Sequence, residues 1–355
     1  MKIKHIRSYS LDLGLTKPYT IAYKITSSVE NVFLEIELEN GLTGYGAAAP
    51  SEYVFGEKME DTISNLQSEI IQRWIGKDIR HFRSIIAESN NLFLKYPASR
   101  TAIDIALHDA FGKYLDIPVV DFYGRHHRSL PTSVTVGISN LEETLHEAKE
   151  YKKRGFRILK VKTGLNLEED IERFTKLRET FGNHFRIRVD ANQGYTPSQT
   201  IAFFEATKSL GLELIEQPLP VGAEAEMKAF PKDLRTVIAC DESLKNDSSA
   251  FFLAMEPRAC GIFNIKLMKC GGLLGAFEIA AVAKAANIEL FWGCYDESIV
   301  SISAALHAAF ACPSTRYLDL DGSFDLSADV FSGGFSLIDG ELSPLNIAGF
   351  GCKRI

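Results

Sequence analysis

The spacing of hydrophobic and polar residues changes near residue 130 and divides the chain into two kinds of region. Residues 1–50 alternate, most clearly in Val32–Leu38, which the turn signal Glu39-Asn40-Gly41 follows. This alternation is typical of antiparallel strands joined by tight turns. Residues 58–117 instead repeat apolar side chains at helical spacing, and the longest predicted helix runs from Ser99 to Leu115. The two patterns together predict an α+β domain at the N-terminus.

Beyond residue 130, short apolar runs alternate with amphipathic stretches. The alternation predicts parallel strands joined by helices, and eight such units predict a closed barrel rather than an open sheet. No glycine-rich phosphate-binding fingerprint follows the first strand, which disfavours a dinucleotide-binding fold. The predicted strands are Ser133–Val136, Arg157–Lys162, Arg186–Asp190, Glu213–Glu216, Thr236–Cys240, Gly261–Lys266, Glu289–Trp292 and Tyr317–Leu320.

We therefore expect an α/β protein, a (β/α)8-type barrel (a modified TIM barrel) with an α+β capping domain. The length of 355 residues accommodates a barrel of ~250 residues and a smaller domain. The expected boundaries are 1–125 for the cap, 126–322 for the barrel and 323–355 for a C-terminal segment that returns to the cap. Glycine-rich turns between short strands support the last assignment.

Composition narrows the setting in which the protein works. A net charge of −7 argues against nucleic acid and against an anionic membrane surface as partners. No apolar run approaches the ~20 residues that cross a bilayer, and the N-terminus begins on a strand pattern without a signal region. We expect a cytoplasmic protein. Its six cysteines form no CxxC pair, which predicts reduced, buried thiols: Cys240, Cys260, Cys270, Cys294, Cys312 and Cys352.

Three acidic residues close three successive predicted strands: Asp190, Glu216 and Asp241. Catalytic groups of barrel enzymes sit at these strand ends. Three carboxylates at one mouth repel each other unless a cation lies among them, and Mg²⁺ prefers such oxygen ligands. Any one acid could instead cap a helix or form an ion pair, but the matched spacing favours a shared site. Glu242, beside Asp241, is expected to support it.

Lysines lie on either side of this acidic set. Lys160 and Lys162 are two residues apart on one strand, so both side chains point to the same face of the sheet. The apolar residues around them indicate that this face is the interior of the barrel. The alternative is that both lysines lie on the protein surface, on an edge strand. Buried lysines are rare, and desolvation with mutual repulsion would lower one pKa and leave a neutral amine able to act as a base.

Lys266 ends the sixth predicted strand, which lies opposite the second in an eight-stranded ring. Lys162 and Lys266 would therefore face each other across the mouth. Two amines on opposite faces of one carbon can remove a proton from one face and return it to the other. Next to a carboxylate this step builds up negative charge, which Mg²⁺ would offset.

These motifs resemble the muconate-lactonizing-enzyme subgroup of the enolase superfamily. The resemblance implies that Asp190, Glu216 and Asp241 bind Mg²⁺, that Lys162 and Lys266 transfer protons, and that Lys160 tunes Lys162. It also implies a homo-oligomer. The motifs that carry it are Lys160-Val161-Lys162, Asp190-Ala191-Asn192, Glu216-Gln217-Pro218, Asp241-Glu242-Ser243 and Lys266.

One further motif indicates which of the family's reactions to expect. Asp319-Leu320-Asp321, at the eighth predicted strand, resembles the Asp-x-Asp motif with which dipeptide epimerases hold the substrate's α-ammonium group. The resemblance implies inversion of the C-terminal residue's α-carbon in a dipeptide by 1,1-proton transfer between two lysines. A turn role for the motif is the simple alternative. N-acylamino acid racemase, o-succinylbenzoate synthase, muconate cycloisomerase and a catalytically silent barrel remain alternative functions.

The preferred dipeptide depends on residues at the rim. Lys24 resembles, in position, the arginine that pairs with the glutamate side chain in Ala-Glu epimerases, although lysine lacks the bidentate fork. We expect Tyr295, Asp296 and Glu297 to contact the substrate, with Asp296 in place of an apolar residue. Asp296 or Glu52 in the pocket would favour a cationic or polar N-terminal residue, whereas solvent-facing acids would not.

Overall fold

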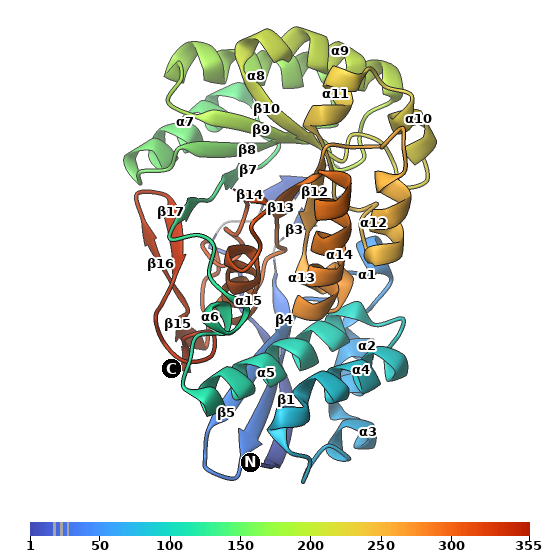
Figure 1. Ribbon diagram of the computed structural model, residues 1–355. Coiled ribbons are helices and arrows are strands. Elements are labelled where there is room, and N and C mark those ends of the chain that lie inside the picture. The colour runs from blue at the N-terminus through green and yellow to red at the C-terminus, as the bar shows by residue number, and fades with distance from the viewer. Residues whose placement is uncertain (17–18, 22–23, 27) are drawn as a thin grey trace.

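The cap is a small antiparallel sheet covered by helices. The computed structural model describes residues 1–16, 19–21, 24–26 and 28–355, and Figure 1 shows the cap in blue to teal below the barrel. Three strands pair in the order β1-β4-β5. The longest helix, α5 (Pro97–Leu115), packs on β5 so closely that a Cβ at Gly46 would lie 2.0 Å from the carbonyl oxygen of Ala102. Glycine is therefore required at this position.

The cap elements follow the predicted order of strands and then helices. Its strands are β1 (Ile3–Asp12), β2 (Tyr19–Ile21), β3 (Lys24–Thr26), β4 (Glu30–Leu38) and β5 (Thr43–Ala48). The helices besides α5 are α1 (Glu52–Phe55), α2 (Met59–Gln67), α3 (Glu69–Gln72), η1 (Ile79–His81), α4 (Phe82–Leu92) and α6 (Val119–Tyr123).

Eight parallel strands form the barrel, paired in sequence order from β7 to β14. A bridge between Thr132 and Leu318 and a 3.0 Å hydrogen bond from the Ser133 N–H to the Leu318 carbonyl join the first strand to the last. The strands are β7 (Val134–Val136), β8 (Ile158–Lys162), β9 (Arg186–Asp190), β10 (Leu212–Glu216), β11 (Ile238–Cys240), β12 (Ile262–Ile265), β13 (Glu289–Trp292) and β14 (Thr315–Leu318).

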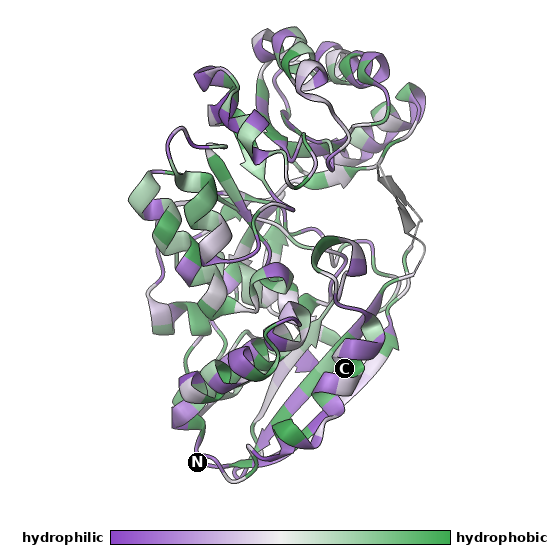
Figure 2. Ribbon diagram, turned by 90° about the vertical axis from the view of Figure 1, so that its right-hand side faces the viewer, coloured by the Kyte–Doolittle hydropathy of each residue, from purple (hydrophilic) through white to green (hydrophobic). Residues whose placement is uncertain are grey.

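Helices cover the outside of the barrel. Figure 2 shows hydrophilic and hydrophobic residues mixed along them, as expected of helices with one face on a sheet and the other toward solvent. They are α7 (Leu141–Lys153), α8 (Leu167–Phe181), α9 (Pro197–Thr207), η2 (Lys208–Leu210), α10 (Glu224–Lys228), α11 (Lys232–Val237), α12 (Asp247–Ala254), α13 (Leu267–Cys270), α14 (Leu273–Ala286) and α15 (Ile299–Phe310).

Two strand predictions were wrong in detail. Thr236 and Val237, predicted as strand, end helix α11, which begins directly after Pro231. Proline favours the start of a helix, and this local signal prevails over the strand preference of the β-branched residues. The last strand begins at Thr315 and ends at Leu318, so Asp319 lies just beyond it rather than within it.

The C-terminal segment packs against the cap. The Phe331 ring lies 5.5 Å from Phe33 and 4.9 Å from Tyr45, and Asp109 of α5 accepts a 2.8 Å hydrogen bond from the Phe350 N–H. Two small sheets form here, β15 (Phe331–Gly333) with β18 (Cys352–Arg354), and β16 (Phe335–Ile338) with β17 (Glu341–Pro344) and β6 (Leu130–Pro131). The segment therefore ties the two larger parts of the chain together.

A buried arginine fills the barrel below its mouth. The Arg188 guanidinium donates to Glu213 at 2.6 Å and to the Leu318 carbonyl at 2.7 Å, and lies about equally far from the rings of Phe291 and Tyr317, 5.2 and 5.1 Å. Its charge is thus both paired and stacked. The barrel below the site is a packed interior rather than a channel.

Two expectations from composition can be compared with the structure. Within the described residues, no helix is both long enough and apolar enough to span a bilayer. The six cysteines are free thiols, and all but Cys294 are buried.

Candidate active site

The predicted acids and lysines meet at one mouth of the barrel. Asp190 and Glu216 end β9 and β10, Asp241 directly follows β11, and Lys160 and Lys162 lie on β8. The sheet register places Lys162 beside Asp190 and Asp190 beside Glu216. Parallel pairing therefore turns three distant strand ends into one cluster, as the sequence pattern predicted.

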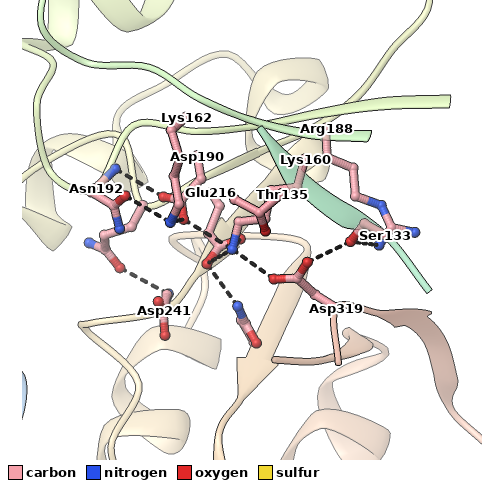
Figure 3. A network of polar contacts seen from close by, with 12 residues as sticks. Ser133, Thr135, Lys160, Lys162, Arg188, Asp190, Asn192, Glu216, Asp241 and Asp319 are labelled. Carbon is pink, nitrogen blue, oxygen red and sulfur yellow. Dashed lines mark hydrogen bonds and ion pairs between the residues drawn. The ribbon is translucent and has the colours of Figure 1, made fainter. Parts of the chain in front are cut away.

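Lys160 is the centre of this cluster. Its ammonium nitrogen lies 3.0 Å from Asp190, 2.9 Å from Glu216 and 2.8 Å from Asp319, and Figure 3 shows these contacts converging. Burial acts to lower the pKa of Lys160, but the three carboxylates outweigh it and hold the pKa well above its ordinary value. Lys160 is therefore a charged anchor here, and the idea that repulsion would make it a neutral amine does not hold for this residue.

Lys162 and Lys266 line opposite sides of the mouth. Lys162 donates to Asp190 at 2.7 Å and to the side-chain oxygen of Asn192 at 3.0 Å. Lys266 follows β12, lies 2.8 Å from Asp241 and sits 4.7 Å above the Tyr295 ring. Three strands separate β8 from β12 on either side of the ring, so the two lysines lie on opposite sides of the barrel mouth, and both line the cavity above it.

The carboxylates of the cluster differ in proton affinity. Burial acts to raise the pKa of Asp190, but Lys160 and Lys162 hold it well below its usual range, and Lys266 and Lys269 do the same for Asp241. For Glu216, burial and the charge of Asp190 prevail and raise the pKa to about 8. The third carboxylate is thus the one for which ionisation is least favourable.

The donor set fits a divalent cation that prefers oxygen. In the described structure no three His, Cys, Asp or Glu side chains are already arranged as a metal cluster, and lysine ammonium groups pair with these acids instead. Oxygen Oε2 of Glu216 is buried and accepts no hydrogen bond of proper geometry within the described residues. Three buried carboxylates, one with an oxygen that pairs with the Lys160 ammonium but accepts no hydrogen bond of proper geometry in the described structure, are a suitable ligand set for Mg²⁺.

Asp319 and Asp321 lie beside the lysines, just past β14. Asp319 accepts a 2.6 Å hydrogen bond from the Ser133 hydroxyl, and Asp321 accepts one of 2.8 Å from the Thr135 N–H. Burial and the charge of Asp319 raise the pKa of Asp321 to about 7. Asp319 is engaged with Lys160, so Asp321 is the member of the pair less committed to a lysine.

A cavity of about 700 Å³ opens over the cluster, between barrel and cap. It is large enough for a dipeptide with long side chains. Its described lining contains Lys160, Lys162 and Lys266, and nine acids: Glu30, Glu143, Glu147, Asp241, Glu242, Asp296, Asp319, Asp321 and Asp325. The excess of carboxylates favours a cationic ligand.

Not every rim prediction is met by the structure. Glu52 is exposed, pairs with Lys58 at 3.2 Å and does not belong to the described lining, because it faces solvent at the start of α1. Glu297 is buried, accepts the Tyr295 N–H at 2.8 Å and supports the loop instead of lining the cavity. Tyr295 and Asp296 do line it. The side chain of Lys24 lies outside the described residues.

Two residues to which the sequence patterns assigned no role complete the cluster. Lys269 is buried on α13, pairs with Asp241 and donates to the Asn264 carbonyl at 3.1 Å. Asn192 bonds Lys162, as described above. Asn192 could have been found from its place two residues after Asp190, whereas Lys269 lies on a short helix, α13, that the sequence pattern did not predict.

An acid–base site of this kind at the mouth of a capped barrel defines a class of enzyme, and the sequence comparisons agree. Residues 7–124 match the mandelate racemase / muconate lactonizing enzyme, N-terminal domain, and residues 143–353 match the enolase C-terminal domain-like family. The chain belongs to the mandelate racemase / muconate lactonizing enzyme family of the enolase superfamily.

Several relatives within this family are epimerases. The chain is 51% identical to an L-Lys-D/L-Arg epimerase of Desulforapulum autotrophicum over the whole of both chains, and 32% identical to an L-Ala-D/L-Glu epimerase of Clostridium acetobutylicum over 100% and 99% of the two. A crystal structure of a dipeptide epimerase from Methylococcus capsulatus with Mg and L-Arg-D-Lys superposes with a TM-score of 0.98, at 47% identity and 99% coverage of both chains.

Proposed function

We propose that this protein is a Mg²⁺-dependent dipeptide epimerase that inverts the C-terminal residue's α-carbon in dipeptides with cationic side chains. The observation that carries the proposal is the pair Lys162 and Lys266 on opposite sides of the mouth, each bonded to a carboxylate of the acidic cluster. Inversion of one carbon needs a proton-transferring group on each of its two faces, and these two lysines meet that requirement. The 51% identical relative is an L-Lys-D/L-Arg epimerase.

In this mechanism each of the two lysines carries out one of the two proton transfers. One of them removes the α-proton from its face of the substrate while the other delivers a proton to the opposite face, and the roles exchange for the reverse reaction. Lys160, held by three carboxylates, stays charged and keeps Asp190, Glu216 and Asp319 in place. Mg²⁺, bound by Asp190, Glu216 and Asp241, would supply positive charge that offsets the negative charge building up on the substrate carboxylate.

Asp321 and Asp319 bind the substrate's α-ammonium group. A buried cationic amine requires anionic partners, and these two carboxylates lie at the edge of the cavity beside Lys160. This subsite distinguishes a dipeptide epimerase from the N-acylamino acid racemases and cycloisomerases of the same family, whose substrates carry no free α-ammonium group. It therefore favours dipeptides over N-acylated amino acids.

The acid-lined cavity predicts a preference for cationic dipeptides. We expect kcat/KM for L-Lys-L-Lys to exceed that for L-norleucyl-L-norleucine by about 10- to 100-fold, since hydrogen bonds to charged groups contribute roughly 1.5–3 kcal/mol each. N-succinyl-L-lysine should be turned over more slowly than either. Chiral chromatography of the products measures all three rates.

Matched variants assign the preference to particular acids. Glu147→Gln and Asp296→Asn remove charges from the cavity wall, whereas Glu142→Gln removes an exposed charge from the same helix, α7, as Glu147. The first two should reduce the preference for lysine over norleucine, and the third should leave it unchanged. Equal rates for charged and neutral dipeptides in the wild-type enzyme would contradict the proposed substrate class.

The raised pKa of Asp321 predicts that kcat/KM depends on pH. Its pKa of about 7 means that below this pH the carboxyl group is neutral and loses its attraction for the α-ammonium group. We expect kcat/KM to fall by up to about tenfold per unit as the pH drops below 7. Asp321→Asn should have a lower kcat/KM throughout and should lack this acidic limb. An unchanged acidic limb in the variant would assign the titration to another group.

A further inference from the structure

The two lysines of the mouth are held by different kinds of partner. Lys266 contacts Asp241 and the ring of Tyr295. Lys162 contacts Asp190 and, through a 3.0 Å hydrogen bond, the side-chain oxygen of Asn192. Asp190 and Asp241 are assigned to the metal under the proposed function. Asn192 is therefore the partner of Lys162 that remains available to it when the carboxylates bind a cation.

Asn192 occupies a backbone conformation that its surroundings impose. Its φ angle is +40°, in the left-handed region that residues other than glycine seldom adopt, and only 6% of its surface is exposed. Its N–H donates to Asp190 at 2.9 Å. Strain of this kind persists only where neighbouring contacts hold it, and it gathers at functional sites. The conformation directs the amide side chain toward Lys162.

Glu242 determines which way this amide faces. The Asn192 amide nitrogen donates to Oε1 of Glu242 at 3.3 Å, and the Lys162 ammonium group on its other side can only donate hydrogen bonds. The amide oxygen is thereby left to face Lys162. Glu242 is itself buried and lines the cavity, and its Oε2 has no hydrogen-bond partner within the described structure. The side chains form a chain in the order Glu242, Asn192 and Lys162.

We propose that Asn192, oriented by Glu242, is a positioning residue that aims the Lys162 amine at one face of the substrate's α-carbon. The inference rests on the proposed function. Lysine has a flexible four-carbon stem, and proton transfer requires its nitrogen to lie along the bond to the departing proton. An acceptor fixed behind the amine restricts this freedom on the Lys162 side, whereas Lys266 does not depend on it.

This arrangement predicts an effect on one epimer. In D2O, the lysine that faces the α-proton of a given epimer removes that proton and can return deuterium from solvent. Exchange of the L,L and L,D epimers therefore reports on the two lysines separately. Lys162→Ala and Lys266→Ala establish which epimer depends on which lysine, so the assignment need not be known beforehand.

The experiment compares initial deuterium incorporation into L-Lys-L-Lys and L-Lys-D-Lys, followed by NMR with saturating Mg²⁺. Asn192→Ala should slow exchange of the Lys162-dependent epimer by about 10- to 100-fold, the effect expected of a mispositioned group, and exchange of the other epimer by less than about threefold. Gln193→Ala is the matched control. Gln193 is the next residue, also has a positive φ of 69°, and accepts a hydrogen bond from the Val221 N–H instead of contacting Lys162. It should show no difference between epimers.

Glu242→Gln provides a second variant, away from the lysine. An amide at position 242 can donate as well as accept, so Asn192 is free to turn over, and the same epimer should lose exchange to a smaller extent. The double variant Asn192→Ala/Glu242→Gln should be no slower than Asn192→Ala alone, because Glu242 acts through Asn192. Additive losses would show that the two residues act independently and would overturn the proposed chain.

The outcomes separate this inference from the function on which it rests. No exchange of either epimer by the wild-type enzyme would refute the epimerase function itself. Exchange of both epimers by the wild type, with equal losses for both in Asn192→Ala, would refute the positioning role and leave the function intact. Selective loss for the Lys162-dependent epimer supports both.

Discussion

Replacing Lys266 with alanine is expected to abolish epimerisation, with kcat lowered by about 10³-fold or more. The expectation follows from the position of Lys266 across the mouth from Lys162, because Lys269, which also pairs with Asp241, does not belong to the described lining of the cavity. General acid–base catalysis contributes roughly 10²- to 10⁴-fold, and inversion needs both partners. Lys162→Ala should have an effect of similar size.

The fold should survive the loss of Lys266. Asp241 would remain paired with the buried ammonium of Lys269, so no carboxylate is left without a cation nearby. Circular dichroism and thermal unfolding check this, and Lys284→Ala, an exposed lysine on α14, serves as the control for activity. A folded Lys266→Ala enzyme that epimerises at more than about a tenth of the wild-type rate would exclude Lys266 from the chemistry.

Glu216→Gln is expected to remove most of the affinity for Mg²⁺. The amide retains the shape of the side chain but not the negative charge that a hard divalent cation requires. We expect the dissociation constant, measured by isothermal titration calorimetry, to rise at least about 100-fold, the upper end of the effects seen even for residues that only support metal ligands. Epimerase activity should fall with it, as it should in wild-type enzyme treated with a chelator.

The same substitution should not destabilise the metal-free protein. Because burial and Asp190 raise the pKa of Glu216 to about 8, ionisation of this group does not stabilise the fold at neutral pH. The free energy of unfolding should therefore be no lower in Glu216→Gln than in the wild type. Glu205→Gln, which removes an exposed charge paired with Lys208, should change neither metal affinity nor activity. Wild-type Mg²⁺ affinity in Glu216→Gln would remove Glu216 from the ligand set.

The sequence was sufficient to locate the residues that depend on strand periodicity. Asp190 and Glu216 end their strands as predicted, because a short apolar run followed by an acid marks both the strand and its functional end. Lys160 and Lys162 also lie where the two-residue repeat of a strand places them. These features are local, so the pattern along the chain contains them.

Some contacts between distant segments could not be predicted. The contact of Lys160 with Asp319 depends on closure of the barrel between β7 and β14, and the hydrogen-bond chain from Glu242 through Asn192 depends on loops after different strands. Whether Glu52 faced the pocket or solvent depended on how cap and barrel pack. Sequence separation, rather than weak local signals, set the limit in these cases.

The most direct test of the central claim is the fate of the α-protons when L-Arg-L-Lys is incubated with the enzyme and Mg²⁺ in D2O. We expect one deuterium to enter each molecule, at the α-carbon of the C-terminal lysine, as L-Arg-D-Lys accumulates. The α-carbon of the N-terminal arginine should keep its proton. A molecule that takes up no deuterium, or takes it up at the N-terminal α-carbon, would contradict proton transfer between Lys162 and Lys266 at the C-terminal residue.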